Sequence, residues 1–217
     1  MMSSRLCQRF CIGVTVMLAY ACVVVPPPAT GVPANPKTLT DWQFRGRIAV
    51  SSVEGSWQGR LNWQQAKEQF SARIDGPIGV GRVSIEGDPS LVVLRLSKDD
   101  TRVISDPQQW LQTEMGWSAP IEHVPFWLIG VPDPNTAVDD IGSVLALHAS
   151  NEYFQRFIQS GWQVYYPEHQ VSAGIWLPRM VILSRQSNAG SGDVFQGDEI
   201  RLRIDEWVMP ERSESSI

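Results

Sequence analysis

Apolar and polar residues alternate along most of the chain after residue 41, which is the pattern of β-strands that bury one face. In the first such stretch Phe44, Ile48 and Val50 alternate with Arg45 and Arg47. Similar stretches, some of them continuously apolar, follow at residues 57–63, 70–74, 83–85, 91–96, 102–104, 162–166, 180–183 and 200–204. Glycine, proline and aspartate turns separate many of them, so the pattern predicts a long antiparallel sheet.

Two short segments have the features of helices. Asp106 followed by Pro107 is a typical helix start, and it predicts a helix that ends near Met115. Residues 120–129 have apolar residues at helical spacing, and Pro125 within them predicts that this helix is kinked or begins later. A long sheet with a few short helices predicts a mainly β fold, of α+β type, in which a curled sheet has its open side or end covered.

Composition limits the class of protein. The chain has 217 residues, of which 43% are hydrophobic and 19% charged, so it can bury a core. Its formal net charge of −5 disfavours general binding to nucleic acid.

The first residues have the features of an export signal. Arg5 and Arg9 precede an uncharged, mostly apolar stretch at residues 10–21, which is too short to span a bilayer comfortably. The run Ala19-Tyr20-Ala21-Cys22 resembles the bacterial lipobox, in which the cysteine becomes the lipidated first residue, although leucine is usual in the position of Ala19. An ordinary cleaved signal or an uncleaved anchor is the alternative.

The expected organisation follows from this interpretation. Residues 1–21 are a signal peptide, residues 22–40 a lipidated start and proline-rich tether, residues 41–210 one domain, and residues 211–217 a tail. We expect no cofactor other than the covalent lipid on Cys22.

Patterns for catalysis and metal binding are weak. Three histidines are scattered and three cysteines lie within the first 22 residues, which leaves no zinc ligand set in the domain. Neither G-x-S-x-G nor H-E-x-x-H occurs. We expect His123 at the surface or capping the second helix, and no credible pair of nucleophile and base is evident. An enzyme is therefore not expected, and a lipid hydrolase is only a rival hypothesis.

The apolar side of the sequence offers more. Nine tryptophans and an aromatic sheet face favour an ordinary core, with an apolar ligand cavity as the alternative. The glycine-rich turn Gly76-Pro77-Ile78-Gly79-Val80-Gly81 has apolar residues where a turn normally has polar ones. Its tip is either exposed for contact with a membrane or partner, or folded into the core.

Several stretches, in order and spacing, resemble the LolB family of outer-membrane lipoprotein receptors. They are Trp42-Gln43-Phe44-Arg45-Gly46-Arg47-Ile48-Ala49, Trp63-Gln64-Gln65, Gly76-Pro77-Ile78-Gly79, Pro125-Phe126-Trp127-Leu128-Ile129-Gly130-Val131-Pro132, Gly161-Trp162-Gln163-Val164-Tyr165-Tyr166, Leu177-Pro178 and Ile200-Arg201-Leu202-Arg203-Ile204-Asp205-Glu206-Trp207.

The resemblance implies an incomplete, strongly curved antiparallel β-barrel with a helical lid over an apolar cavity. The two predicted helices are then lid candidates. Candidate residues for an acyl-binding cavity are Ile48, Trp57, Leu61, Trp63, Trp127 and Leu128. The turn Pro77, Ile78 and Gly79 matches a loop that helps to deliver cargo to the membrane, with Ile78 in the apolar role.

The resemblance also implies partners and a place in the cell. A LolA-like periplasmic carrier would deliver lipoprotein cargo, and the chain would insert it into outer-membrane phospholipid without a nucleotide. The chain would be a monomer, anchored by Cys22 in the outer membrane with its domain facing the periplasm. The alternative function is a tethered envelope module that binds another apolar ligand or an envelope complex.

Overall fold

A computed structural model describes residues 35–76, 82–88, 90–115, 119–148, 151–185 and 198–209. All of them belong to one compact unit, Gly31–Ile217. The predicted signal, Cys22 and the tip of the Gly76–Gly81 turn lie outside the described residues. Within the described residues no helix is both long and apolar enough to cross a bilayer.

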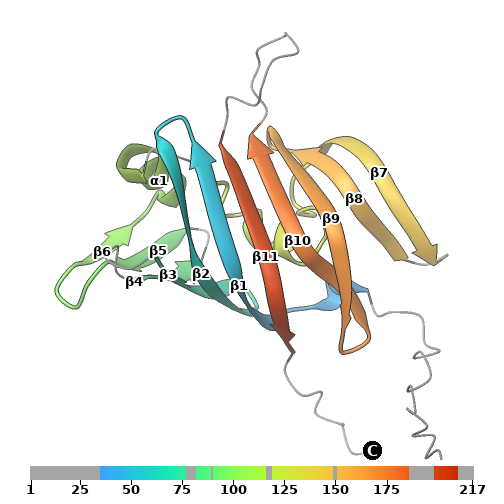
Figure 1. Cartoon of the computed structure of the whole chain (residues 1–217), viewed down its shortest axis with the longest axis horizontal. Helices are drawn as coiled ribbons and strands as arrows, with labels where there is room; N and C mark the ends of the chain where they lie inside the picture. Colours follow the sequence, from blue (N-terminus) through green and yellow to red (C-terminus); the bar gives the residue numbers. More distant parts are fainter. Residues whose placement is uncertain are drawn as a thin grey trace, which may run out of the picture. The chain divides into compact units, whose positions relative to one another are not determined.

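The described residues form one antiparallel sheet of eleven strands, ordered β6-β5-β4-β3-β2-β1-β11-β10-β9-β8-β7. The strands are β1 (Asp41–Ser52), β2 (Gly55–Ala66), β3 (Gln69–Asp75), β4 (Arg82–Asp88), β5 (Leu91–Arg95), β6 (Thr101–Ile104), β7 (Val138–His148), β8 (Asn151–Gln159), β9 (Trp162–Ser172), β10 (Ile175–Arg185) and β11 (Glu199–Val208). The sheet is strongly curved (Figure 1) and its edge strands β6 and β7 do not pair with each other, which confirms the predicted incomplete barrel.

Two helices lie in the connection between the edge strands. The chain leaves β6, forms α1 (Pro107–Met115) and α2 (Val124–Leu128) over the concave face, and enters β7 at the opposite edge (Figure 1). The sheet and this connection therefore enclose the core between them.

Alternation along β1 shows how the sequence determines the inner face. Trp42, Phe44 and Ile48 are buried, and the arginines between them point outward. Gly46 lies on the inner face where the register with β11 shifts, and a Cβ there would collide with the carbonyl oxygen of Arg203. This close approach of two backbones requires glycine.

An aromatic cluster closes one side of the core. The ring of Trp63 stacks on Phe70 with 4.9 Å between centroids, and Trp207 packs edge-on against Phe44 at 5.4 Å. Trp42 lies between them, stacked on Trp63 at 6.3 Å. Such pairs add stability beyond the burial of their area.

The predicted helices are present, with one boundary moved. The side chain of Asp106 accepts a hydrogen bond from the backbone of Gln109 at 2.8 Å, which confirms it as the cap of α1. The second helix begins later than residue 120, at Val124, so that Pro125 lies in the first turn. There a missing N–H removes no helical hydrogen bond.

Strands β7 and β8 are not predicted by the alternation of residue types. The register between them shifts at several places, so apolar positions in β7 do not follow a period of two. In β8, Tyr153 and the adjacent Phe154 are both buried, and Phe157 follows three residues later. This spacing resembles a helix as much as a strand.

The first described residues pack on the domain. Pro36–Thr38 forms a single turn of 3₁₀ helix, η1, and Pro36 is buried. The side chain of Asn35 caps this turn by accepting a hydrogen bond from the backbone of Lys37 at 2.9 Å.

Candidate functional site: an apolar cavity under two short helices

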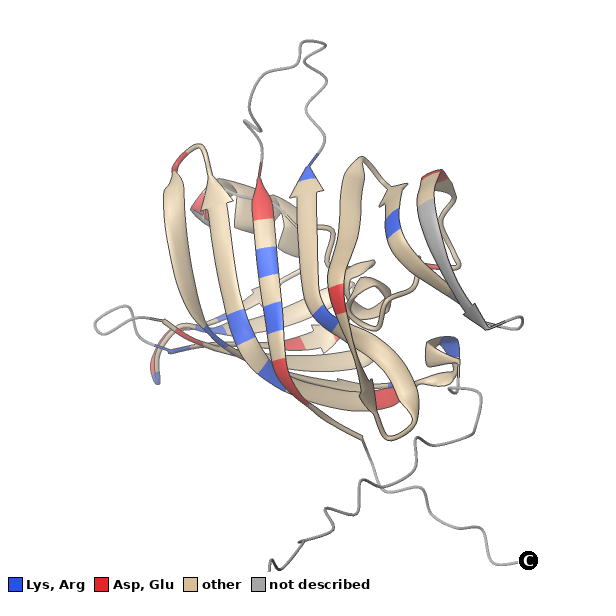
Figure 2. Cartoon of the chain, turned by 45° about the vertical axis from the view of Figure 1, so that its right-hand side comes forward, with Lys and Arg blue, Asp and Glu red and all other residues tan. Residues whose placement is uncertain are grey.

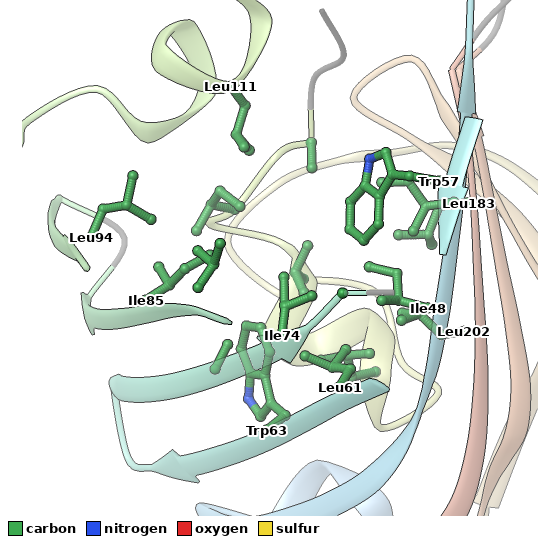
Figure 3. Close-up of a pocket in the computed structure, with 18 of the residues that line it drawn as sticks. Ile48, Trp57, Leu61, Trp63, Ile74, Ile85, Leu94, Leu111, Leu183 and Leu202 are labelled. Atoms are coloured by element: carbon green, nitrogen blue, oxygen red, sulfur yellow. The ribbon is translucent and has the colours of Figure 1, made fainter. Parts of the chain in front are cut away.

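A cavity of about 320 Å³ lies between the concave face of the sheet and the two helices. Its lining consists of apolar side chains and one glycine: Ile48, Trp57, Leu61, Trp63, Ala72, Ile74, Gly76, Val83, Ile85, Leu94, Leu96, Trp110, Leu111, Ala119, Ile121, Val124, Leu128, Leu183, Ile200 and Leu202. Figure 3 shows Trp57, Trp63 and Leu111 around this space, with aliphatic side chains from the neighbouring strands.

The period of two in the strands positions these residues. In β2, Leu61 and Trp63 point inward, and Gly59 completes the same face. A Cβ on Gly59 would come within 2.8 Å of the carbonyl oxygen of Asp75, so glycine lets β3 approach closely here. Ile74 and Ile85 continue the inner face on β3 and β4 (Figure 3).

The indole N–H of Trp63 already has a hydrogen-bond partner within the protein. This group donates to Oε1 of Gln65 at 3.1 Å, and Nε2 of Gln65 donates to the carbonyl oxygen of Lys67 at 2.8 Å. Apart from the indole nitrogens of Trp57 and Trp110, the described lining offers methyl, methylene and ring carbons to a guest. This environment suits an apolar chain and supplies no group for acid–base chemistry.

Helix α2 forms a wall that is firmly attached to the sheet. Val124 and Leu128 face the cavity, while Trp127 is fully buried behind them. The hydroxyl of Tyr166 donates to the carbonyl oxygen of Trp127 at 2.8 Å. Burial raises the pKa of Tyr166 well above its ordinary value, so the phenol remains a proton donor.

The side-chain amide of Gln159, fully buried on β8, is the centre of this attachment. Its Oε1 accepts from Nε1 of Trp127 at 2.8 Å and from the backbone N–H of Asp133 at 3.0 Å. Its Nε2 donates to the carbonyl oxygens of Asp133 and Thr136 at 2.9 and 2.8 Å. One residue thus fixes α2 and the loop after it.

His123 is buried, with 5% of its surface exposed, so the expectation that it lies at the surface is wrong. It precedes α2 but its side chain makes no capping hydrogen bond. Its Nδ1 is 2.7 Å from Oδ2 of Asp133, and its Nε2 is 2.8 Å from Oγ of Ser160. The structure therefore unites a serine, a histidine and an aspartate that no motif in the sequence connects.

The surroundings of this trio argue against nucleophilic catalysis. The backbone N–H that follows Ser160, in Gly161, points at Oδ2 of Asp139 at 3.4 Å. A carboxylate at that place would repel the negative charge that develops during acyl transfer, where an oxyanion hole needs donors. We interpret the trio as a buried polar link between α2, the following loop and the β8–β9 turn.

Helix α1 is attached much more weakly. Leu111 is buried and Trp110 half-buried, whereas Gln112, Thr113 and Glu114 are exposed. Its contact with the sheet through charged groups is an ion pair of 3.8 Å between Arg102 and Glu114. Elements with few buried contacts open first, so α1 is the more movable of the two covers.

The predicted cavity residues fall into two groups. Five of them, Ile48, Trp57, Leu61, Trp63 and Leu128, lie around the cavity. Trp127 is not in the described lining, because its indole faces Gln159 on the far side of α2.

The sequence pattern predicts no cavity residues from β3, β4, β5, α1 or β11. Ile74, Ile85 and Leu202 lie on strands that alternate as predicted, but alternation along one strand does not indicate which strands meet around a cavity. Pro77, Ile78, Gly79 and Cys22 lie outside the described residues.

A second hollow, of about 1110 Å³, lies on the other side of α2 and has a mixed lining. Lys67, Glu68, Glu122 and Asp133 contribute charges to it, beside aromatic residues such as Phe126. Within the described ranges no group of three or more histidine, cysteine or acidic residues could hold a metal ion.

Comparison with known proteins assigns the chain to a family. Residues 40–207 match the family model described as "Outer membrane lipoprotein LolB". The outer-membrane lipoprotein LolB of Nitrosococcus oceani is 28% identical over 176 residues, which cover 79% of this chain and 78% of that protein. LolB of Pseudomonas fluorescens is 30% identical over 170 residues, covering 78% of this chain and 75% of that protein.

A solved structure is also similar. A LolA superfamily protein from Nitrosomonas europaea aligns with a TM-score of 0.48 and 9% identity, over 79% of this chain and 86% of that one. The residues matched by the family model contain strands β1 to β10, nearly all of β11, both α-helices and the described lining of the cavity. The chain therefore belongs to the LolB family of outer-membrane lipoproteins.

Proposed function

We propose that the chain accepts lipoproteins from a LolA-like periplasmic carrier, holds their acyl chains in the apolar cavity and inserts them into the outer membrane. Membership of the LolB family gives it a role in outer-membrane lipoprotein localization, and it is not an enzyme. The observation that carries the finer proposal is the cavity itself, because the residues described in its lining are apolar.

The energetics of acyl chains favour such a transfer without a nucleotide. Moving one methylene group from water into an apolar environment is favourable by about 0.8 kcal/mol. An acyl chain therefore transfers without an energy source only if it passes from one apolar environment to another. The cavity offers such an environment between a soluble carrier and the bilayer. The described lining is almost wholly apolar, so little in it would hold the cargo against final release into the membrane.

The size of the cavity implies movement. A cavity of about 150 Å³ in another protein holds benzene, so about 320 Å³ accommodates roughly a dozen carbon atoms. That is less than the acyl chains of a lipoprotein require. Helix α1 is the weakly attached cover, and its displacement would enlarge the cavity while α2 stays in place.

Two further sites belong to the proposal and rest on the sequence. A lipid on Cys22 would hold the domain at its destination and raise its concentration at the membrane. Pro77, Ile78 and Gly79, in the turn between β3 and β4, would present an apolar tip to the bilayer. Gly76, the first residue of the glycine-rich turn, borders the cavity.

The decisive experiment follows radiolabelled, acylated lipoprotein from a loaded carrier to residues 23–217 of this chain, without ATP. Movement of the label to this chain, detected by photo-crosslinking or co-purification, is the expected result. Absence of movement, with the carrier loaded and the chain folded, would refute acceptance of cargo and favour a module for another apolar ligand.

Two matched variants test the cavity. Ile85→Glu places a charge on a half-buried cavity residue, and Val53→Glu places the same charge on a hairpin side chain that is 81% exposed. We expect Ile85→Glu to abolish acyl binding with the fold retained by circular dichroism, and Val53→Glu to bind as the original chain does.

The turn is tested separately with Ile78→Glu. We expect this variant to accept cargo normally and to fail at insertion into vesicles. Normal insertion by Ile78→Glu would remove the turn from the proposed mechanism without affecting the cavity.

A further inference from the structure

The outer face of the sheet has a row of arginines that the strand register places side by side. Arg203 of β11 faces Arg47 of β1, and Arg47 faces Arg60 of β2. The row continues through Asp75 of β3 to Arg82 of β4. Blue segments of β1 and β11 are adjacent on this face in Figure 2. Like charges directly opposite each other destabilise a sheet. A row of arginines therefore points to a role other than stabilising the fold.

Positive charge exceeds negative charge on this part of the face. We call it the arginine surface, and its members are Arg47, Arg60, Arg73, Arg82, Arg95 and Arg203. Four carboxylates pair with it: Asp205 with Arg47 at 2.9 Å, Asp75 with Arg82 at 2.6 Å, Glu86 with Arg95 at 3.0 Å, and Glu168 with Arg203 at 3.8 Å. The excess is local, because the whole chain has a formal net charge of −5.

Arg60 and Arg73 are the members best placed to bind something else. Both are exposed, and neither forms an ion pair with a described residue. Arg60 lies opposite Asp75, but that carboxylate is already bound by Arg82. Arg73 lies between Asn62 and Ser84, which have no charge.

The location of these two arginines indicates the partner. Asp75 is the last residue of β3, and Arg60 lies opposite it on β2. Arg73 lies two residues before Asp75 on β3. Both arginines are therefore close to the start of the turn that contains Ile78. This step rests on the proposed function, in which that turn meets the bilayer. The guanidinium group binds phosphate with two parallel hydrogen bonds, which suits a phospholipid headgroup.

We propose that the arginine surface, through Arg60 and Arg73, binds the anionic phospholipid headgroups of the bilayer beside the β3–β4 turn. An acidic carrier protein fits less well. Gly59 and Leu61, the neighbours of Arg60 in β2, belong to the inner face of the sheet. The side chain of Arg60 therefore points outward, away from the cavity that a carrier must reach. Headgroup binding would orient the domain with its turn toward the membrane.

The test measures sedimentation with vesicles of phosphatidylcholine alone or with one third phosphatidylglycerol. It uses residues 31–217, the compact unit that contains the whole described sheet and its buried core. The test variant is Arg60→Gln with Arg73→Gln. The control is Arg156→Gln with Arg185→Gln, which removes the same charge from exposed positions on β8 and β10, three or more strands away from β2.

We expect the original chain to bind the anionic vesicles more tightly than the neutral ones, and less so in high salt. One arginine near an anionic surface contributes about fivefold in affinity, so the test variant should lose more than tenfold and the control less than twofold. Equal losses in the two variants, no dependence on phosphatidylglycerol, or binding to a polyglutamate peptide but not to vesicles would each overturn the proposal.

A parallel measurement separates this proposal from the proposed function. Binding of a fluorescent acyl probe reports the cavity alone, and we expect the test variant to bind it normally. Loss of vesicle binding with normal probe binding supports the arginine surface. If the original chain binds vesicles through Arg60 and Arg73 but takes no acyl probe, the cavity function fails and the surface remains.

Discussion

Replacing Gln159 by leucine tests whether one buried amide holds α2 as a fixed wall of the cavity. The change keeps the side chain close in size and removes four hydrogen bonds of 2.8 to 3.0 Å. Two buried donors, Nε1 of Trp127 and the backbone N–H of Asp133, then lose their partner. So do the buried carbonyl oxygen of Asp133 and the part-buried carbonyl oxygen of Thr136.

The magnitude follows from these four groups. A buried polar group without a partner costs about 1–3 kcal/mol, and carbonyl oxygens, with two lone pairs, are at the low end. Leucine recovers part of the loss by its greater hydrophobicity, so we expect a net loss of about 3–4 kcal/mol in the free energy of unfolding. For a domain of this size that corresponds to a fall of roughly 10 °C in Tm.

The assay is urea unfolding followed by tryptophan fluorescence, with hydrogen exchange to locate the change. The midpoint should fall without a change in slope, and amides of residues 124–129 should exchange faster. The control is Gln163→Leu, since Gln163 on β9 is half-buried and makes none of these bonds. A loss below about 1 kcal/mol for Gln159→Leu, or equal losses for both variants, would refute the role of the amide.

Three other predictions concern Ser160, His169 and Trp110. Ser160→Ala should lower the free energy of unfolding by about 1 kcal/mol, because it removes one hydrogen bond to His123. A fluorophosphonate should not label Ser160 in the original chain, which mass spectrometry would show. Burial lowers the pKa of His169, so its neutral form is favoured in the folded state. The stability this contributes is present above the unfolded pKa of about 6.5 and is lost as pH falls toward the folded pKa. His169→Gln should flatten the pH dependence of the urea midpoint in that range, and an unchanged profile would contradict the prediction. Trp110→Ala should speed the uptake of a fluorescent acyl probe in stopped flow, because α1 loses a half-buried contact with the cavity; slower uptake would argue that α1 does not open.

Some parts of the molecule were predictable because they depend on neighbours in the chain. The alternation in β1 and β2 is sufficient to place Ile48, Leu61 and Trp63 on the inner faces of their strands. The cap at Asp106 and the late start of α2, at Val124 just before Pro125, follow from backbone chemistry within one turn. Strands β7 and β8 escaped prediction because their irregular register breaks the period of two, and such shifts depend on the partner strand.

Local patterns in the sequence were enough to predict most of the sheet, the two short helices, the apolar inner face and the resemblance to the LolB family. Each of these is written in local periodicity or in the order of short motifs. Tertiary packing turns Trp127 away from the cavity, where its indole N–H donates a hydrogen bond to Gln159, thirty-two positions later in the chain. It alone joined His123 to Ser160, and it alone aligned Arg203, Arg47 and Arg60 across three strands. These contacts depend on how distant segments meet in space, and no local pattern of residues encodes that distance.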